Sequence, residues 1–168
     1  MITLEQLLES RDRRAAHQTE LMRAFPGTAL VCLTVQLPGS VKRNARSLVI
    51  GGAGLAALTD IFGSVLSHLQ VKDLETGYEA YLLVRLPARL VKSLCVSIEE
   101  EHPLGRLMDI DVRTPEGAID RQAIGIPPRK CLLCDNEVRY CMRAKNHTTE
   151  ELLKRIDEIV REFVTKPL

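Results

Sequence analysis

Apolar residues recur along this chain with two different periods, and each period predicts one kind of element. A spacing of three to four residues places apolar side chains on one face of a helix. The helices predicted in this way cover residues 4–23, 46–69, 87–94 and 148–163. The first and last of them begin at sequences typical of capping boxes, Thr3 with Gln6 and Thr148 with Glu151.

Other stretches alternate between apolar and polar residues, or are short apolar runs bounded by turn residues, as in β-strands. The predicted strands cover residues 29–37, 71–74, 78–86, 95–98, 107–112 and 118–124. Short turns at Glu75–Gly77 and Thr114–Gly117 predict two hairpins. The order of elements predicts an α+β (mixed α/β) fold, with a largely antiparallel sheet flanked by helices and residues 1–168 forming a single domain.

Composition narrows the classes of protein that this chain can be. Hydrophobic residues make up 45% and charged residues 27%, and the net charge is only +1, which does not favour nucleic acid as a partner. We expect no membrane span and no signal peptide, since no apolar run approaches about 20 residues and the N-terminus is charged. Five cysteines, an odd number, favour reduced thiols and a cytoplasmic location.

The strongest local candidate for chemistry is the stretch His102–Val112, HPLGRLMDIDV. On a strand, Asp109 and Asp111 would share one face, about 6–7 Å apart. Adjacent carboxylates repel each other, and Mg²⁺ commonly bridges such a pair to substrate phosphates. The preceding Arg106 can bring a guanidinium group to phosphate. The alternative is a solvated strand edge on which the acids pair with arginine.

The stretch Pro38–Lys42, PGSVK, lies between a predicted strand and a predicted helix. Gly39 allows close backbone approach, the loop N–H groups can receive phosphate, and Lys42 adds a positive charge. An ordinary turn explains the same residues and is favoured when the stretch is taken alone.

Four potential zinc ligands follow one another as Cys131, Cys134, Cys141 and His147. If this segment were helical, the cysteines would share a face and His147 would point away from them. We therefore favour packing of the cysteines as small hydrophobic residues over a structural zinc site.

The segment Gly52–Ala57 fits the outline G-x-G-x-x-A of a dinucleotide-binding loop, with Asp73 at a suitable distance. Only three apolar residues, Leu48–Ile50, precede it as a possible strand. Glycine within a packed helix explains the pattern equally well. A dinucleotide-binding oxidoreductase is nevertheless one alternative function, and a non-catalytic zinc-stabilised binding module for a lyase subunit is another.

Several separated motifs, in the same order, resemble the CitX family of apo-citrate lyase phosphoribosyl-dephospho-CoA transferases. The resemblance is carried by HPLGRLMDIDVRTPEG, PPRKCLLC and CMRAKNH, with Ser10–Asp12, Pro38–Lys42, Ile98–Glu99 and Leu152–Leu153. It implies a nucleotidyltransferase-type transfer of the 2′-(5″-phosphoribosyl)-3′-dephospho-CoA group from its triphosphoribosyl precursor. The acceptor would be a serine of the apo acyl carrier protein (gamma) subunit of citrate lyase, and diphosphate would leave.

The resemblance, combined with the local chemistry, assigns expected roles to individual residues. Asp109 and Asp111 would hold Mg²⁺, and Arg106 and Lys42 would contact the triphosphate, with His102 as a helper. The other expected substrate-binding residues are Gly39, Ser40, Gly105, Arg11 and Arg129.

The acidic strand also resembles the metal-binding strand of polymerase-β-like nucleotidyltransferases, and this resemblance implies a nucleotidyltransferase-like fold. In those enzymes a Gly-Ser pair closely precedes the acidic strand, whereas here Gly39 and Ser40 lie far upstream. Asp120 and Glu99 are the candidates for a third carboxylate.

Overall fold

The computed structural model describes residues 1–35 and 37–166, so Gln36, which falls in the first predicted strand, lies outside the described residues. The helices are α1 (Leu4–Ala24), α2 (Ala45–Phe62), α3 (Ala88–Glu101), α4 (Val138–Ala144) and α5 (Thr149–Thr165). The strands are β1 (Ala29–Val35), β2 (Leu66–Leu74), β3 (Gly77–Val84), β4 (Asp109–Thr114) and β5 (Gly117–Ile119). They form one sheet in the order β2-β3-β1-β4-β5, in which every neighbouring pair is antiparallel. The predicted α+β class and antiparallel sheet are confirmed.

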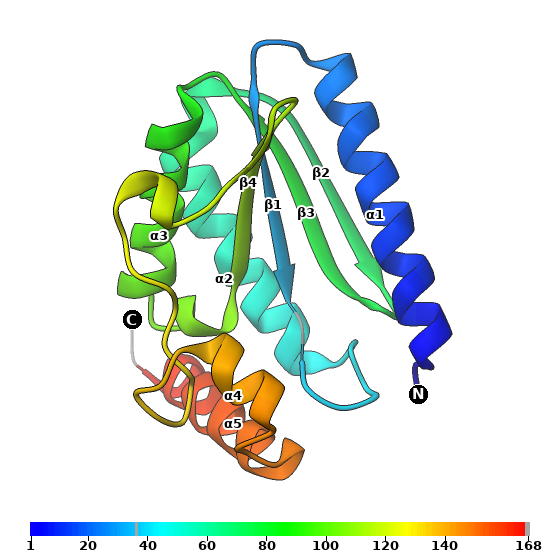
Figure 1. The fold of residues 1–168 in the computed structure, drawn as a ribbon, viewed down its shortest axis with the longest axis vertical. Helices are drawn as coiled ribbons and strands as arrows, with labels where there is room; N and C mark the ends of the chain where they lie inside the picture. The colour runs from blue at the N-terminus through cyan, green and yellow to red at the C-terminus, as the bar shows by residue number, and fades with distance from the viewer. Residues whose placement is uncertain (36, 167–168) are drawn as a thin grey trace.

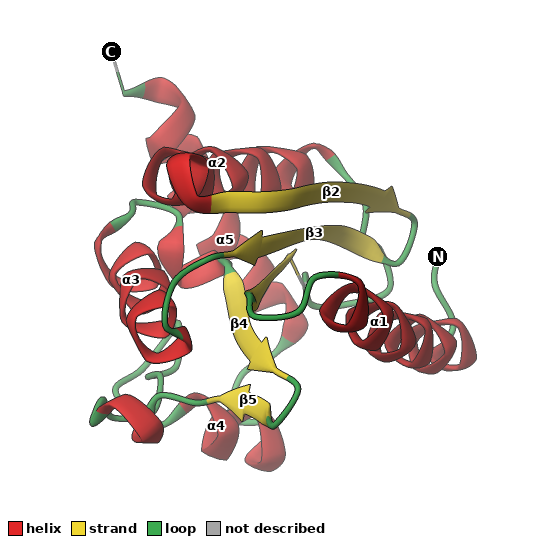
Figure 2. Ribbon diagram, turned by 90° about the horizontal axis from the view of Figure 1, so that it is seen from above, coloured by secondary structure: helices red, strands yellow, loops and turns green. Residues whose placement is uncertain are grey.

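Helices lie on both faces of this sheet (Figures 1 and 2). α2 and α3 cover one face and build the main hydrophobic core with it, and Ile50, Leu58 and Phe62 of α2 are fully buried there. α1 runs across the opposite face, where Leu21 packs in a smaller cluster with Leu30 and other residues of β1 and β3. The two apolar clusters hold the sheet between helical layers.

The central strands β1 and β3 are buried at every residue because helices cover both of their faces. α1 is fixed over the β2–β3 side of the sheet by hydrogen bonds from Ser10 to Thr76 and from Arg14 to Glu79. The outer part of the same face, on β4, is less covered, and Asp111 there is exposed. The candidate site lies on this open part of the sheet.

Several predicted elements are wrong in their extent or kind, and three of the differences are large. The helix predicted over 46–69 ends at Phe62, and β2 already begins at Leu66. The strand predicted over 95–98 is the second half of α3, and the strand predicted over 118–124 ends at 119, before a short 3₁₀ turn. Short apolar runs fit either a strand or a buried helix, so the sequence pattern could not separate these cases.

The segment Ala45–Val65 is long enough and apolar enough, by composition, to cross a membrane, which differs from the expectation that no stretch qualifies. In the structure most of this segment is α2, one face of which packs against the sheet through Ile50 and Leu58. This is the arrangement of a core helix.

Candidate active site

Asp109 and Asp111 lie on the same face of β4, as strand alternation predicts. Ile110 and Val112, which alternate with them, are 1% exposed and belong to the main core on the other face. Across the strand pair, Asp109 lies opposite Thr34 of β1. The burial of the alternating apolar residues therefore fixes both carboxylates on the opposite, more open side of the sheet.

A third carboxylate, Glu79, lies on the same face of the sheet, opposite Thr34 on the other side of β1. Its side chain is only 4% exposed. One oxygen accepts a 2.9 Å hydrogen bond from Nε of Arg14, and the other accepts a short one from the Tyr81 hydroxyl. Glu79 is thus held in a buried network under α1, with its charge balanced by Arg14.

Two charged residues of α3 form hydrogen bonds with the backbone of β4 at a position that β5 does not reach. β5 pairs with β4 only from Val112 to Thr114, so the polar backbone groups of Ile110 have no strand partner on that edge. Its N–H donates to Oε1 of Glu99 at 3.0 Å, and its carbonyl accepts from Nζ of Lys92 at 3.0 Å. These buried side chains replace the missing strand and fix β4 between its two aspartates.

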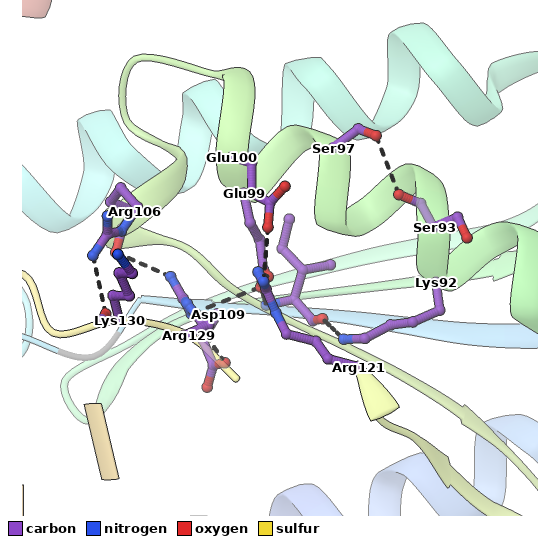
Figure 3. Close-up of polar contacts among 11 residues, drawn as sticks. Lys92, Ser93, Ser97, Glu99, Glu100, Arg106, Asp109, Arg121, Arg129 and Lys130 are labelled. Carbon is purple, nitrogen blue, oxygen red and sulfur yellow. Dashed lines mark hydrogen bonds and ion pairs between the residues drawn. The ribbon is translucent and has the colours of Figure 1, made fainter. Parts of the chain in front are cut away.

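Arginines from the segment after β5 surround this edge (Figure 3). Arg121 contacts Glu99 at 2.7 Å and Glu100 at 2.8 Å. Arg129 places Nη1 3.7 Å from Glu99 and 3.8 Å from Asp109. Arg129 is therefore a cation that the structure brings to the acidic pair, and its expected contact with substrate stays a prediction.

The environment of Asp109 disfavours its charged form. Partial burial and the nearby negative charge of Asp111 raise the pKa of Asp109, while Arg129 opposes this effect. The folded state therefore loses stability as the pH rises through the interval between the ordinary carboxyl pKa and the raised one.

Asp109→Asn is accordingly expected to raise the melting temperature at pH 7 in buffer without divalent cations. Because the side chain is half exposed, we expect a gain of no more than about 4 °C. The gain should disappear below the ordinary carboxyl pKa of about 3.9, where the wild-type side chain is also neutral. Thermal melts of the variant and the wild type across this pH range test the prediction. A lower melting temperature of the variant at pH 7 would show that the attraction of Asp109 to Arg129 dominates.

Gly105 and Arg106 lie in the short turn between α3 and β4, where both have structural partners. A Cβ atom on Gly105 would lie 2.3 Å from the carbonyl oxygen of Ile98, so the turn can pack against the end of α3 only with glycine. Nη2 of Arg106 donates to the carbonyls of Lys130 and Cys131, at 3.0 and 2.8 Å. Their expected contacts with substrate stay predictions.

Gly105→Ala is expected to destabilise the protein by about 1–3 kcal/mol, since the clash involves backbone that cannot rotate away. The matched control is Gly52→Ala, on the exposed face of α2, where a Cβ would meet nothing within 4 Å. We expect that change to stabilise by about 0.4–1 kcal/mol. Denaturant unfolding of both variants compares the two effects, and equal stabilities would refute the close-packing argument.

His102 is directed toward α5. Its Nδ1 accepts a 3.0 Å hydrogen bond from the N–H of Leu104, and its ring lies 5.7 Å from that of Phe163. Burial lowers the pKa of His102 and so favours the neutral ring. These contacts do not bring it to the aspartates, and its expected helper role stays a prediction.

The loop with Gly39, Ser40 and Lys42 follows the end of β1, the strand on which Thr34 faces Asp109. Nζ of Lys42 donates to the carbonyl of Leu37 at 2.5 Å, and partial burial together with the positive charge of Arg11 lowers the pKa of Lys42. The structure therefore brings the two expected cations, Lys42 and Arg11, close to each other at this loop.

The two candidates for a third metal-binding carboxylate have other partners. The Glu99 carboxylate accepts a hydrogen bond from Ile110 and pairs with Arg121 and Arg129, as described above. Asp120 accepts a 2.8 Å hydrogen bond from the N–H of Ala123 and so caps the turn after β5. The acidic centre of the site therefore consists of Asp109 and Asp111.

The cysteine segment differs from the helix considered in the sequence analysis. Only Cys141 lies in a helix, α4, which is preceded by the loop with Cys131 and Cys134. The chain then reverses at Lys145, which has a positive φ of 50°, and returns His147 to the cysteines. The inference that His147 points away is wrong, and the four side chains form a group that can bind a metal such as zinc.

Comparison with known proteins identifies one family for this chain. Residues 2–163 match the family model of CitX, described as apo-citrate lyase phosphoribosyl-dephospho-CoA transferase. The chain belongs to the CitX family. A relative from Vibrio cholerae serotype O1 (strain M66-2), named a probable apo-citrate lyase phosphoribosyl-dephospho-CoA transferase, is 37% identical over 96% of this chain and 93% of its own length. A relative with the same name from Streptococcus pyogenes serotype M3 is 32% identical over 98% of this chain and 88% of its own.

The structure argues against the dinucleotide-binding alternative, and membership of the CitX transferase family agrees with this. Gly52 and Gly54 lie inside the continuous helix α2, and Leu48–Ile50 belongs to the same helix. A dinucleotide loop needs a strand before its glycines and a helix after them. Gly54 is instead a packing residue, since a Cβ there would lie 2.9 Å from the side chain of Leu33.

The sequence analysis of this CitX protein missed three charged residues around the site, Glu79, Lys92 and Arg121. The signal for Glu79 was a single acid within the otherwise apolar strand GYEAYLLV. For Lys92, the signal was its spacing of seven residues from Glu99, which places both on one side of a helix. Neither signal identifies the partner of the charged group, because Arg14, which pairs with Glu79, and the edge of β4, which Lys92 serves, are distant in the sequence.

Proposed function

We propose that this CitX-family protein transfers 2′-(5″-phosphoribosyl)-3′-dephospho-CoA from its triphosphoribosyl precursor to a serine of the apo acyl carrier protein (gamma) subunit of citrate lyase. The transferase role rests on the family match and on relatives named for this activity. The acidic pair on the open face of β4 supports a nucleotidyltransferase-type reaction for it.

The proposed reaction is a displacement at phosphorus. The serine oxygen forms a bond to the phosphorus nearest the ribose, and the bond from that phosphorus to the diphosphate oxygen breaks. The diphosphate leaves with the bonding electron pair, and the serine proton passes to water. Little covalent work is required of the protein, so binding, orientation and charge compensation provide most of the rate enhancement.

The observation that carries this proposal is the placement of Asp109 and Asp111 side by side on an open sheet face, with Arg129 at the edge. Oxygen ligands of this kind suit Mg²⁺. Burial, and after it the negative charge of Asp111, raises the pKa of Asp109, and a bound cation would relieve both effects. Bound Mg²⁺ would offset negative charge on the phosphoryl group and on the leaving diphosphate. Asp109 and Asp111 are the residues that would hold it.

Arg129 beside the acidic pair, and Lys42 and Arg11 at the loop after β1, are cations that suit a polyphosphate ester. Arg129 reaches Asp109 directly, whereas Lys42 and Arg11 lie near each other at the loop that follows β1. We propose that this loop, with Gly39 for close backbone approach, receives the part of the triphosphate that leaves. Arg129 would then stand beside the acidic pair, where it adds positive charge near the phosphoryl group under attack.

The test is incubation of the protein with apo carrier protein, triphosphoribosyl-dephospho-CoA and Mg²⁺, followed by intact mass measurement of the carrier. We expect a mass increase equal to one phosphoribosyl-dephospho-CoA group, with release of one diphosphate. The same incubation with a carrier whose acceptor serine is replaced by alanine should give no increase. An unchanged mass of the wild-type carrier would refute the proposed reaction.

A further inference from the structure

Cys131, Cys134, Cys141 and His147 converge from three consecutive pieces of chain onto one point. One ligand atom from each lies within 4.8 Å of all the others. Sγ of Cys134 lies 3.4 Å from Sγ of Cys141 and 3.4 Å from Nε2 of His147. In a tetrahedral site with Zn–S and Zn–N bonds of about 2.3 and 2.0 Å, neighbouring ligand atoms are roughly 3.5–3.8 Å apart. The group is therefore close to the dimensions of a structural zinc site.

The backbone around the first two cysteines is shaped to present their sulfur atoms. The N–H of Cys131 donates to the carbonyl of Asn136 at 2.7 Å, and Val138 donates to Arg129 at 2.9 Å, which closes a tight loop.

Ordinary core packing does not explain how this segment stays folded. From residue 121 to residue 155, all of which the structure describes, only Cys131 and Cys141 are buried, at 6% and 5% exposure. The large apolar side chains of Tyr140 and Met142 are 59% and 73% exposed. A stretch of this length with so little buried apolar surface needs another source of stability, and a structural metal supplies folding free energy directly.

The loop is connected to the acidic strand through its backbone. Arg106, just before β4, donates to the carbonyls of Lys130 and Cys131. Arg129, two residues before Cys131, donates to the carbonyl of Arg106 at 3.1 Å and reaches Asp109 (Figure 3). Whatever fixes Cys131 also fixes Arg129 beside the acidic pair.

We propose that Cys131, Cys134, Cys141 and His147 bind one structural Zn²⁺, which folds the segment between β5 and α5 and positions Arg129 beside Asp109. All four ligands come from the protein, so this is a closed site without a position for substrate. The metal-binding claim does not depend on the proposed transferase reaction.

The test measures metal in the full-length protein, purified under reducing conditions without a histidine tag. We expect about one Zn²⁺ per chain in the wild-type protein, and less than about a tenth of that in Cys134→Ser and His147→Asn. The matched control is Cys95→Ala, which changes a buried cysteine of α3 outside the group and should keep its full zinc content. Zinc retained by the ligand variants would overturn the proposal.

Co²⁺ substitution keeps the test decisive if a ligand variant fails to fold. Co²⁺ added to chelator-treated wild-type protein should give the intense visible bands of tetrahedral thiolate coordination, and Zn²⁺ should displace it. A zinc-free, folded wild-type protein that gives no such bands would refute the site. So would a wild-type mass lower by two hydrogens, since a Cys134–Cys141 disulfide would then occupy the ligands.

The positioning role is tested separately from metal binding. Removal of zinc should lower the transferase rate, and the chelated protein should regain it when Zn²⁺ is restored. In an Arg129→Ala background, zinc removal should lower the remaining rate much less, because the residue that the metal positions is absent. An equal loss in both backgrounds would overturn the positioning role and leave the metal site intact.

Discussion

Asp111→Asn is expected to reduce the initial rate of carrier-protein modification by about 100-fold or more. A bound cation contributes several kcal/mol of charge stabilisation in the transition state, and each 1.4 kcal/mol changes the rate about tenfold. Asp111 is exposed on β4, so its replacement should leave the fold intact. The measurement is the rate of carrier mass gain at saturating Mg²⁺, with circular dichroism and melting temperature confirming that the variant is folded.

The matched control for this prediction is Asp60→Asn, which removes an exposed carboxylate of α2 and should retain nearly the wild-type rate. The double variant Asp109→Asn, Asp111→Asn should have no detectable activity. If the double variant still modified the carrier at the wild-type rate, the acidic pair would have no catalytic role. The zinc content of the double variant does not bear on the catalytic role of the acidic pair, because the proposed zinc ligands are different residues.

Glu99→Ala is expected to lower the free energy of unfolding by about 3–5 kcal/mol, the range measured when one partner of a buried ion pair is removed. The Glu99 side chain is 4% exposed and serves three groups at once, namely Arg121, Arg129 and the N–H of Ile110. Removing it leaves a buried backbone donor without a partner and releases the arginine that reaches Asp109. The transferase rate should therefore fall together with stability.

The adjacent residue provides the control. Glu100 contacts only Arg121 among the ion pairs of the described residues and is 53% exposed, so Glu100→Ala should cost less than about 1 kcal/mol. Glu99→Gln, which keeps an oxygen to accept from Ile110, should fall between the two alanine variants. Denaturant unfolding measures all three, and equal stabilities of Glu99→Ala and Glu100→Ala would contradict the role assigned to the strand edge.

Local sequence determined the parts of this protein that depend on nearest neighbours. Alternation along DIDV placed Asp109 and Asp111 on one face, since successive strand residues point to opposite sides whatever they pack against. The capping boxes at Thr3 and Thr148 form as predicted, because their hydrogen bonds span only three residues. The motifs quoted from the sequence were also sufficient to indicate the CitX family, which the comparisons show.

Tertiary structure decided the features that depend on residues distant in the sequence. Cys95 lies in a helix because Val91, Cys95 and Ile98 together form the face that α3 packs on the sheet, and a four-residue window cannot reveal this. Glu99 acts at an edge that exists only because β5 stops short of Ile110.

The same distinction explains the cysteine segment. Its ligand types could be seen in the sequence, but the return of His147 to Cys134 depends on the loop before α4 and the reversal at Lys145. A helical periodicity applied across the whole segment therefore gave the wrong direction for His147. Sequence alone determined which chemical groups this protein has, and the long-range path of the chain decided which of them meet.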